Sequence, residues 1–217
     1  VLEGVNSMGI KSLIKSGLLE VWPDLFDARV DDRAAPDLAD VVGGGRESFY
    51  SNPDEFFERT YLTTSMRGLI EDVAKVLRDR TGGGTFILTS LFGGGKTHTQ
   101  IFLYHAFTSP GKLSVFDNEL ASKVAEAGKP IIVVMDCSRA NFVPHPEEPC
   151  RIGGFEIKTI WGMLAYRLGA YAKIKHLDSG KAAAPDVNLL RRILSEPKEP
   201  VIILLDEICL LYTSDAA

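Results

Sequence analysis

The stretch "FILTSLFGGGKTHTQ", residues 86–100, runs from an apolar segment through three glycines into Lys96 and Thr97. It is either a phosphate-binding loop or a flexible turn that precedes a lysine. A phosphate-binding loop requires backbone N–H groups that converge on an anion, the positive end of a helix, a lysine for the outer phosphates and a hydroxyl for magnesium. Lys96 can supply the lysine and Thr97 the hydroxyl. Gly93, Gly94 and Gly95 allow the backbone to approach a phosphate closely.

The flanking sequence decides between these interpretations. Residues 85–89 are apolar and rich in β-forming residues, which predicts a strand, and "THTQIFLYHAF" (97–107) is apolar on most faces, which predicts a buried helix. Strand, glycine loop and helix are the context of a Walker A loop. Ser90 departs from the pattern G-x-x-x-x-G-K-[ST], which has its first glycine there, but two extra glycines precede Gly95. Phosphate binding is therefore favoured over a glycine-rich turn.

A second motif lies at "VIILLDE", residues 201–207, where an apolar strand is predicted to end in Asp206 and Glu207. In P-loop ATPases a carboxylate at this Walker B position holds the magnesium shell, and the next one orients or deprotonates the attacking water. Asp206 follows Lys96 by 110 residues, which leaves room for two helical crossovers and a strand. The alternative is two solvated carboxylates that close a strand. Both motifs together favour a nucleotide site with Lys96 and Glu207 as its catalytic residues.

The rest of this region predicts an α/β fold. "KPIIVVMD" (129–136) is typical of a parallel strand buried on both faces. A long helix is expected over 155–174 and a shorter one over 185–197, between prolines. Strands that alternate with helices indicate a parallel sheet. The predicted fold class is thus a P-loop NTPase parallel sheet of the ATPase branch, incomplete and preceded by a small helical region.

The N-terminal region, residues 1–80, is predicted to be helical. A short helix is expected within 10–22, and a firmer one begins at Pro53, with Asn52 as its N-cap. Apolar residues then recur on one helical face from Met66 to Leu77, and Gly82 to Gly84 are expected to end that helix. The P-loop core follows over 81–208, and 209–217 form a separate tail.

Composition limits the classes of protein. The chain has 217 residues, 45% of them hydrophobic, and a net charge of −5, so it carries no overall basic field for nucleic acid. Its three cysteines have neither disulfide-framework nor zinc-site spacing, which predicts free thiols in a reducing cytosol. Neither a membrane span nor a secretory signal is evident. We expect a cytoplasmic protein without membrane contact.

Several polar residues have weaker signals. His98 and His105 lie seven residues apart on the predicted helix, and packing is favoured over metal binding because no third ligand is evident. Asp136 ends the middle strand, where a loop-capping role is favoured over a third functional carboxylate. For Arg139 and Arg151 a surface position is favoured over contact with a phosphate or a partner.

Four blocks in order, "DEFFERTYLT", "SLFGGGKTHT", "TIWGMLAYRLG" and "PVIILLDEI", resemble the large prokaryotic AAA+-like ATPases catalogued as domain of unknown function 499. The resemblance covers about residues 37–208. It implies bound ATP and Mg²⁺, with Thr97 and Asp206 at the metal and Glu207 as the catalytic carboxylate. It implies nucleotide contacts at Phe92, Gly93, Gly94, Gly95, Lys96, Thr97 and His98. Members often occur beside DNA methyltransferases and in phage-defence clusters, which suggests DNA-associated partners, and AAA+ proteins oligomerise through later segments.

The resemblance also predicts a strand order. In the ATPase branch, a later strand lies between the strand of the Lys-Thr loop and the strand that ends in Asp-Glu. That strand is not found here, because residues 209–217 leave the family pattern and resemble a translated sequencing-adapter tail. We expect an N-terminal fragment in which 85–89 and 201–205 are separated by a gap, show unpaired edges or close non-natively. Such a fragment is expected to be poorly soluble and inactive in hydrolysis.

Two classes of function remain open at the level of sequence. The first is an ATP-hydrolysing motor or switch, which Glu207 favours. The second is a nucleotide-dependent binding or scaffold protein without useful turnover. A P-loop GTPase is less favoured because the guanine-reading N/T-K-x-D motif is absent, and a small-molecule kinase lacks an identifiable acceptor site.

Overall fold

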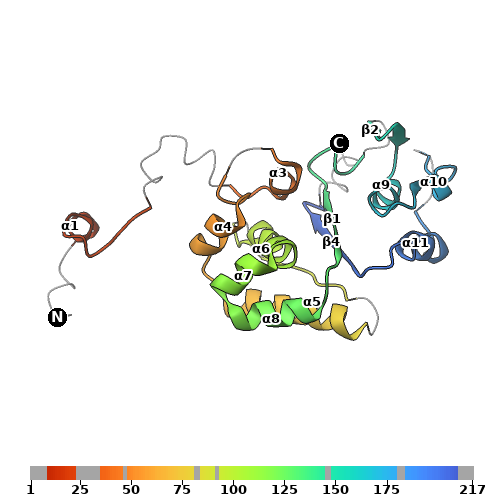
Figure 1. Cartoon of the computed structure of the whole chain (residues 1–217). Coiled ribbons are helices and arrows are strands. Elements are labelled where there is room, and N and C mark those ends of the chain that lie inside the picture. The colour runs from red at the N-terminus through yellow and green to blue at the C-terminus, as the bar shows by residue number, and fades with distance from the viewer. Residues whose placement is uncertain are drawn as a thin grey trace. The chain divides into compact units, whose positions relative to one another are not determined.

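The computed structural model describes residues 9–22, 35–45, 48–80, 84–90, 93–144, 148–179 and 184–209. The chain divides into two compact units, residues 1–35 and 36–217. In the first unit, α1 (Ile10–Lys15) forms within the segment where apolar periodicity predicts a helix (Figure 1). All other elements belong to the second unit.

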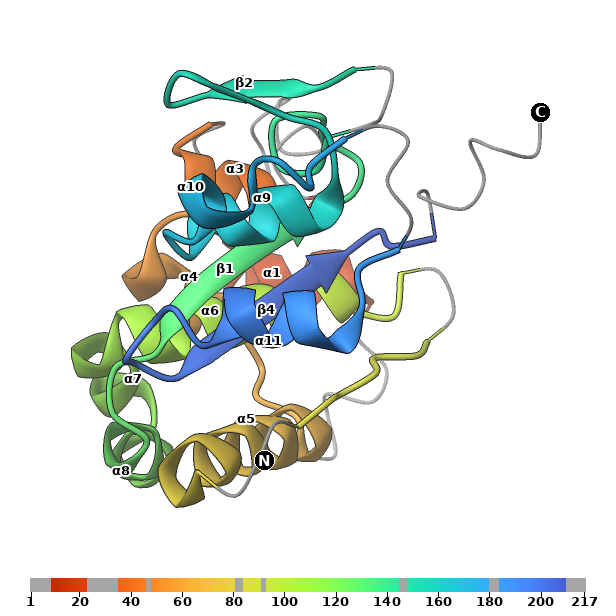
Figure 2. The same cartoon turned by 90° about the vertical axis from the view of Figure 1, so that its right-hand side faces the viewer.

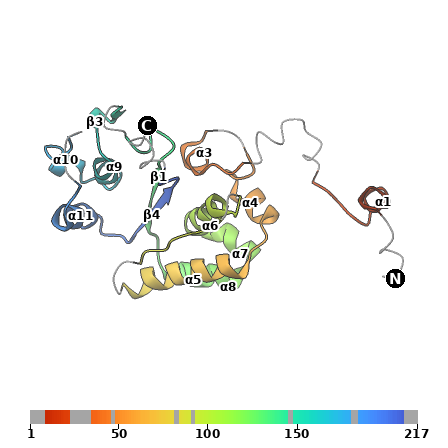
Figure 3. The same ribbon diagram turned by 180° about the vertical axis from the view of Figure 1, so that it is seen from behind.

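A two-stranded parallel sheet forms the centre of the second unit. It pairs β1 (Ile131–Asp136) with β4 (Val201–Asp206), in a register that joins Ile131 to Val201 and Asp136 to Asp206. Both strands were predicted from their continuous apolar runs, and their parallel pairing is confirmed. Because side chains alternate along a strand, each strand contributes to two cores, one on either face. Figures 1 and 3 show helices on both sides of this sheet.

The first face packs on a helical layer. Val134, Ile202 and Leu204 share one apolar core with Phe56 and Phe102. The helices of this layer are α3 (Leu38–Gly43), α4 (Pro53–Arg59), α5 (Thr64–Asp79), α6 (Lys96–Thr108), α7 (Pro110–Phe116) and α8 (Asn118–Glu126). Helices α3 to α5, from the predicted N-terminal region, therefore share a core with α6 to α8, from the predicted P-loop region.

The second face packs on a hairpin and three helices. Val133 and Met135 share a core with Ile157, Met163 and Ile193. The elements are β2 (Cys150–Ile152), β3 (Phe155–Ile157), α9 (Ile160–Arg167), α10 (Tyr171–Ile174) and α11 (Val187–Leu194), and β2 pairs antiparallel with β3. Helix α11 matches the helix predicted between prolines.

The long helix predicted over 155–174 is wrong. Its first residues form β3, which pairs with β2 across a turn at Gly153 and Gly154, both at positive φ. Thr159 then caps α9 by accepting a hydrogen bond from the Gly162 N–H at 3.0 Å. Gly169, with φ of 77°, separates α9 from α10. The apolar residues are buried as expected, but the glycines and the cap divide them among three elements.

Helix boundaries in the first layer follow their capping residues. Asn52 caps α4 by accepting from the Asp54 N–H at 3.0 Å, and Pro53 is the first helical residue, as predicted. Of the glycines expected to end the next helix, Gly82 and Gly83 lie outside the described residues. Helix α5 ends at Asp79, because Arg80 adopts the left-handed conformation with φ of 50°, before Gly82 to Gly84 are reached.

The strand predicted at 85–89 is also wrong. Residues 84–90 are described, and they form no ladder with β1, β4 or any other described strand. Phe86 and Ile87 expose 41% and 80% of their surface. A strand requires a neighbouring strand for its backbone N–H and C=O groups, and residues 85–89 pair with none of the described strands. Because 85–89 is not a strand, its expected separation from 201–205 by an intervening strand stays a prediction.

The three cysteines are free, as expected. Cys150 is buried, Cys137 is partly buried and Cys209 is exposed. In the described part of the chain, no helix combines the length and apolarity needed to cross a membrane.

Candidate functional site

The glycine loop leads directly into α6. Gly93 and Gly95 adopt the left-handed conformation, with φ of 76° and 77°, and a Cβ atom at either would meet nothing within 4 Å. Lys96 is the first residue of α6, so Gly95 occupies the N-cap position. The local backbone therefore requires glycine for its conformation and not for space.

Among the described helices of the second unit, α6 and the shorter α7 and α10 begin without a side-chain cap. No described side chain caps α6, because its N-cap residue is Gly95. Six other helices begin with a side chain that accepts a first-turn N–H: Asp37, Asn52, Thr63, Asp117, Thr159 and Asp186. The first N–H groups of a helix have no intrahelical partner and carry its positive end. At α6 these groups are left to solvent or to an anion.

The Lys96 side chain contacts Ser90, which precedes the glycines. Its Nζ atom donates to the Oγ atom of Ser90 at 3.4 Å, and its side chain remains partly exposed. Ser90 is the residue that replaces the first glycine of the Walker A pattern. Thr97, the second residue of α6, is also partly exposed. Phe92, predicted as a nucleotide contact, lies outside the described residues.

His98 does not face the open loop. Its Nε2 atom lies 3.3 Å from Thr60 Oγ1, and its ring packs against Phe56 and Tyr50, at centroid distances of 4.9 and 5.8 Å. His105 is buried, and its Nε2 atom lies 2.7 Å from the Tyr50 carbonyl oxygen, as the packing interpretation predicts. Burial lowers the pKa of both histidines.

Two buried carboxylates end the parallel strands. Asp136 and Asp206 are 4% and 8% exposed and are paired in register. Asp136 Oδ1 accepts from the N–H and the hydroxyl of Ser138, at 2.9 and 2.6 Å, which is the loop-capping role predicted for it. Asp206 Oδ1 accepts from the Glu207 N–H at 3.1 Å. By strand alternation both aspartates share the face of Val134 and Leu204, which packs on the α6 layer.

Glu207 follows at once and is exposed. Its φ of 51° lies in the left-handed region, where a residue with a Cβ atom is strained. Strained non-glycine residues occur disproportionately at functional sites. Glu207 is therefore both accessible and held in an unusual backbone conformation.

These features gather at one end of the sheet. Figure 2 shows α6 beginning on the side toward which β1 and β4 point, and Figure 1 shows α6 beside the same strands. In open α/β sheets, ligands bind outside the carboxyl ends of the strands. The open helix terminus, Lys96, Asp206 and Glu207 thus belong to the end of the sheet where such ligands bind.

The carboxylates make this end of the sheet electrostatically negative. Cys137 follows Asp136, and its N–H donates to the Asp206 carbonyl oxygen at 3.1 Å. Burial, together with the negative charges of Asp136, Asp206 and Glu207, raises the pKa of the Cys137 thiol to about 11. The thiol stays protonated at neutral pH, so Cys137 is not a nucleophile. A bound cation would be favoured in this field.

Sequence reasoning missed two polar centres. Thr60 lies within the block "DEFFERTYLT", but the sequence assigns it no role there. Asp178 is buried and accepts from the Lys158 N–H and the hydroxyls of Thr159 and Tyr171, at 3.0, 2.6 and 2.7 Å. Asp178 stabilises the start of α9, on the second face of the sheet. No sequence signal marks it.

Arg139, in the loop after β1, and Arg151, in the hairpin, differ in their contacts. Arg139 pairs with Asp37 and lies 3.2 Å from Asp40, so it ties this loop to α3. Arg151 is exposed, with Glu156 at 3.4 Å, as expected for a surface arginine. In the described residues neither arginine approaches the open terminus of α6 through a recorded contact.

Comparison with known proteins gives one result. The model of the family described as the DUF499 N-terminal domain matches residues 8–215. No curated protein and no solved structure shows a significant match.

Proposed function

The chain belongs to the DUF499 N-terminal domain family, and on that premise we propose that it binds ATP with Mg²⁺ at the loop before α6. The observation that carries the proposal is the N-terminus of α6, which follows two left-handed glycines and has no side-chain cap. Phosphate oxygens bind such a terminus because they accept its free N–H groups and interact with the helix dipole. Lys96, at the same terminus, adds a flexible positive charge for the outer phosphates.

The residues present also fit a magnesium ion. Mg²⁺ prefers oxygen ligands and keeps several waters. The Thr97 hydroxyl and the Asp206 carboxylate would hold it, either directly or through water. The bound ion would neutralise charge on the phosphates. The negative field of Asp136, Asp206 and Glu207, which raises the pKa of Cys137, favours a cation at this place.

We propose further that the site hydrolyses ATP in the manner of an AAA+-like P-loop ATPase. Glu207 is exposed immediately beyond Asp206, where its carboxylate can orient a water and accept its proton. The parallel pairing of β4 with β1 is compatible with the strand order of the ATPase branch. A role beside DNA modification or phage defence, and assembly through later AAA+ segments, follow from the family resemblance alone.

Calorimetry of Mg-ATP binding tests the proposal. In the full-length protein, Lys96→Ala removes a charge-assisted contact and should weaken binding by about 10-fold or more. Lys112→Ala is the matched control, because it removes an exposed lysine of α7 that pairs with Asp54 at 2.6 Å. Equal affinity of the Lys96→Ala and unaltered proteins would refute the phosphate site.

A further inference from the structure

His98 links the first turn of α6 to the end of α4. It is the third residue of α6, next to Lys96 and Thr97, but its side chain lies toward Thr60, the residue that follows α4. The ring is held against Phe56 at 4.9 Å between centroids. The contact joins residues 38 positions apart in the sequence.

The direction of the hydrogen bonds can be assigned. The Thr60 hydroxyl donates its single proton to the Phe56 carbonyl oxygen at 2.6 Å, so toward His98 it can only accept. The His98 Nε2 atom, 3.3 Å away, therefore carries a proton and donates it. Thr60 is only 7% exposed, so water does not readily replace His98 as its partner. A directional relay runs from His98 through Thr60 to the backbone of α4.

This relay acts on the turn that holds the phosphate-binding N–H groups. The backbone N–H of residues 96–98 form the open terminus of α6, and the orientation of that turn decides where they point. Binding by several N–H groups is sensitive to small changes in their direction. A side chain anchored at residue 98 limits rotation of the turn about the helix axis.

We infer that His98 is a positioning residue for the phosphate-binding turn, acting through its hydrogen bond to Thr60 and its packing on Phe56. The inference rests on the proposed nucleotide site and gives His98 a role other than the direct nucleotide contact that the family resemblance implies. Thr60 is its partner in this role.

His105 provides an internal control. It lies two turns further along α6, is buried, and makes a hydrogen bond of 2.7 Å to the Tyr50 carbonyl oxygen. Its ring also packs on Phe56, at 5.2 Å. It shares the contact with Phe56 but is more deeply buried than His98 and is remote from the open terminus. Loss of its hydrogen bond should affect stability without reorienting the phosphate-binding turn.

The test measures the Mg-ATP dissociation constant and the melting temperature in the full-length protein. Thr60→Val is nearly isosteric and removes the acceptor, and His98→Phe keeps an aromatic ring and removes the donor. Each should weaken binding by about 5-fold, the scale of one hydrogen bond. Thr60→Ser retains the hydroxyl and should restore affinity to within about twofold. His105→Phe should lower the melting temperature and leave the dissociation constant unchanged.

A double variant, Thr60→Val with His98→Phe, decides whether the two residues act together. If they share one bond, the double variant should bind about as well as either single variant. Additive losses, unchanged affinity in both single variants, or an equal loss in His105→Phe would overturn the positioning role. If Lys96→Ala abolishes binding while these variants retain it, the nucleotide site stands and only the role of His98 fails. If the unaltered protein does not bind Mg-ATP, both proposals fail.

Discussion

Helices α6 and α8 begin in opposite ways within the same layer. Asp117 closes α8, since its Oδ1 atom accepts from the Leu120 N–H at 3.0 Å and its Oδ2 atom pairs with Arg67 of α5. Gly95 leaves α6 without a side-chain cap. A carboxylate at the N-cap position stabilises the helix, because it accepts a first-turn N–H and lies at the positive end of the helix. A helix that begins with glycine leaves its first N–H groups without a side-chain partner, which is the arrangement that the proposed phosphate site would use.

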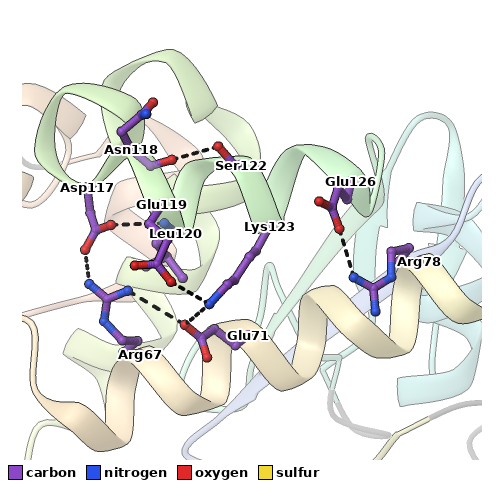
Figure 4. Close-up of polar contacts among 10 residues, drawn as sticks. All are labelled: Arg67, Glu71, Arg78, Asp117, Asn118, Glu119, Leu120, Ser122, Lys123 and Glu126. Carbon is purple, nitrogen blue, oxygen red and sulfur yellow. Dashed lines mark hydrogen bonds and ion pairs between the residues drawn. The ribbon is translucent and has the colours of Figure 1, made fainter.

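The two helices are also held differently. Figure 4 shows ion pairs between α8 and α5. The Lys123 Nζ atom lies 3.0 Å from a carboxylate oxygen of Glu71 on α5 and 2.9 Å from one of Glu119 on α8, and an Arg78 nitrogen lies 2.8 Å from a carboxylate oxygen of Glu126. Helix α6 is instead held by burial of most of its length: Gln100, Ile101, Phe102, Leu103, His105, Ala106 and Phe107. Burial fixes the helix without occupying its terminus. The open end is therefore carried on a well-packed element.

The largest expected effect comes from a Glu207 variant that retains nucleotide binding but loses hydrolysis. In the full-length protein, Glu207→Gln should retain Mg-ATP affinity but lose about 100-fold or more in turnover, because the amide cannot accept a proton from water. Steady-state ATPase assays and calorimetry measure the two quantities. Equal hydrolysis rates would remove Glu207 from the mechanism, and absent turnover in the unaltered protein would favour a binding or scaffold role.

Removal of the N-cap of α8 should lower the stability of the fold without changing nucleotide binding. Asp117→Ala removes both the cap and the Arg67 ion pair, and should lower the free energy of unfolding by about 1–2 kcal/mol in urea denaturation. Asp186→Ala is the matched control, since Asp186 caps α11 by accepting from the Leu189 N–H at 2.7 Å, and its loss should be smaller. Mg-ATP affinity should not change. A weaker affinity in Asp117→Ala would show that the two termini are coupled.

The smallest expected effect concerns the glycine at the open terminus. Gly95→Ala places a Cβ atom at φ of 77° and should cost about 1 kcal/mol of backbone strain, which weakens Mg-ATP binding by about 5-fold if the loop shifts to relieve it. Gly68→Ala, within α5 and in open space, should instead raise the free energy of unfolding by about 0.5–1 kcal/mol. Unchanged binding and stability in Gly95→Ala would show that the left-handed conformation is unnecessary.

Much of the fold follows from sequence patterns, where a local signal suffices. The continuous apolar runs of β1 and β4 predict buried parallel strands, and Asn52 with Pro53 predicts the start of α4. Residues 85–89 have a similar apolar run but no partner among the described strands. An apolar run therefore predicts a preference for burial, and pairing depends on segments elsewhere in the chain.

The candidate site can likewise be predicted from sequence only where a local signal exists. The spacing of glycines, Lys96 and Asp206 predicts the end of the sheet at which they gather, since each residue belongs to a recognisable element end. The direction of the His98 side chain could not be predicted, because a motif specifies positions along the chain and not which neighbour packs against them. Thr60 and Phe56 come from another helix, and only the packed structure brings them to His98.

The pairing of β1 with β4 has a consequence for the order of folding. Sixty-four residues separate the end of β1 from the start of β4, whereas β2 and β3 are joined by a two-residue turn. Contacts between distant residues form slowly, because the loop between them must close first. We expect the glycine loop to form early with its neighbouring helices and Asp206 to arrive late. Pulse-labelling hydrogen exchange would then protect the amides of α6 before those of β4.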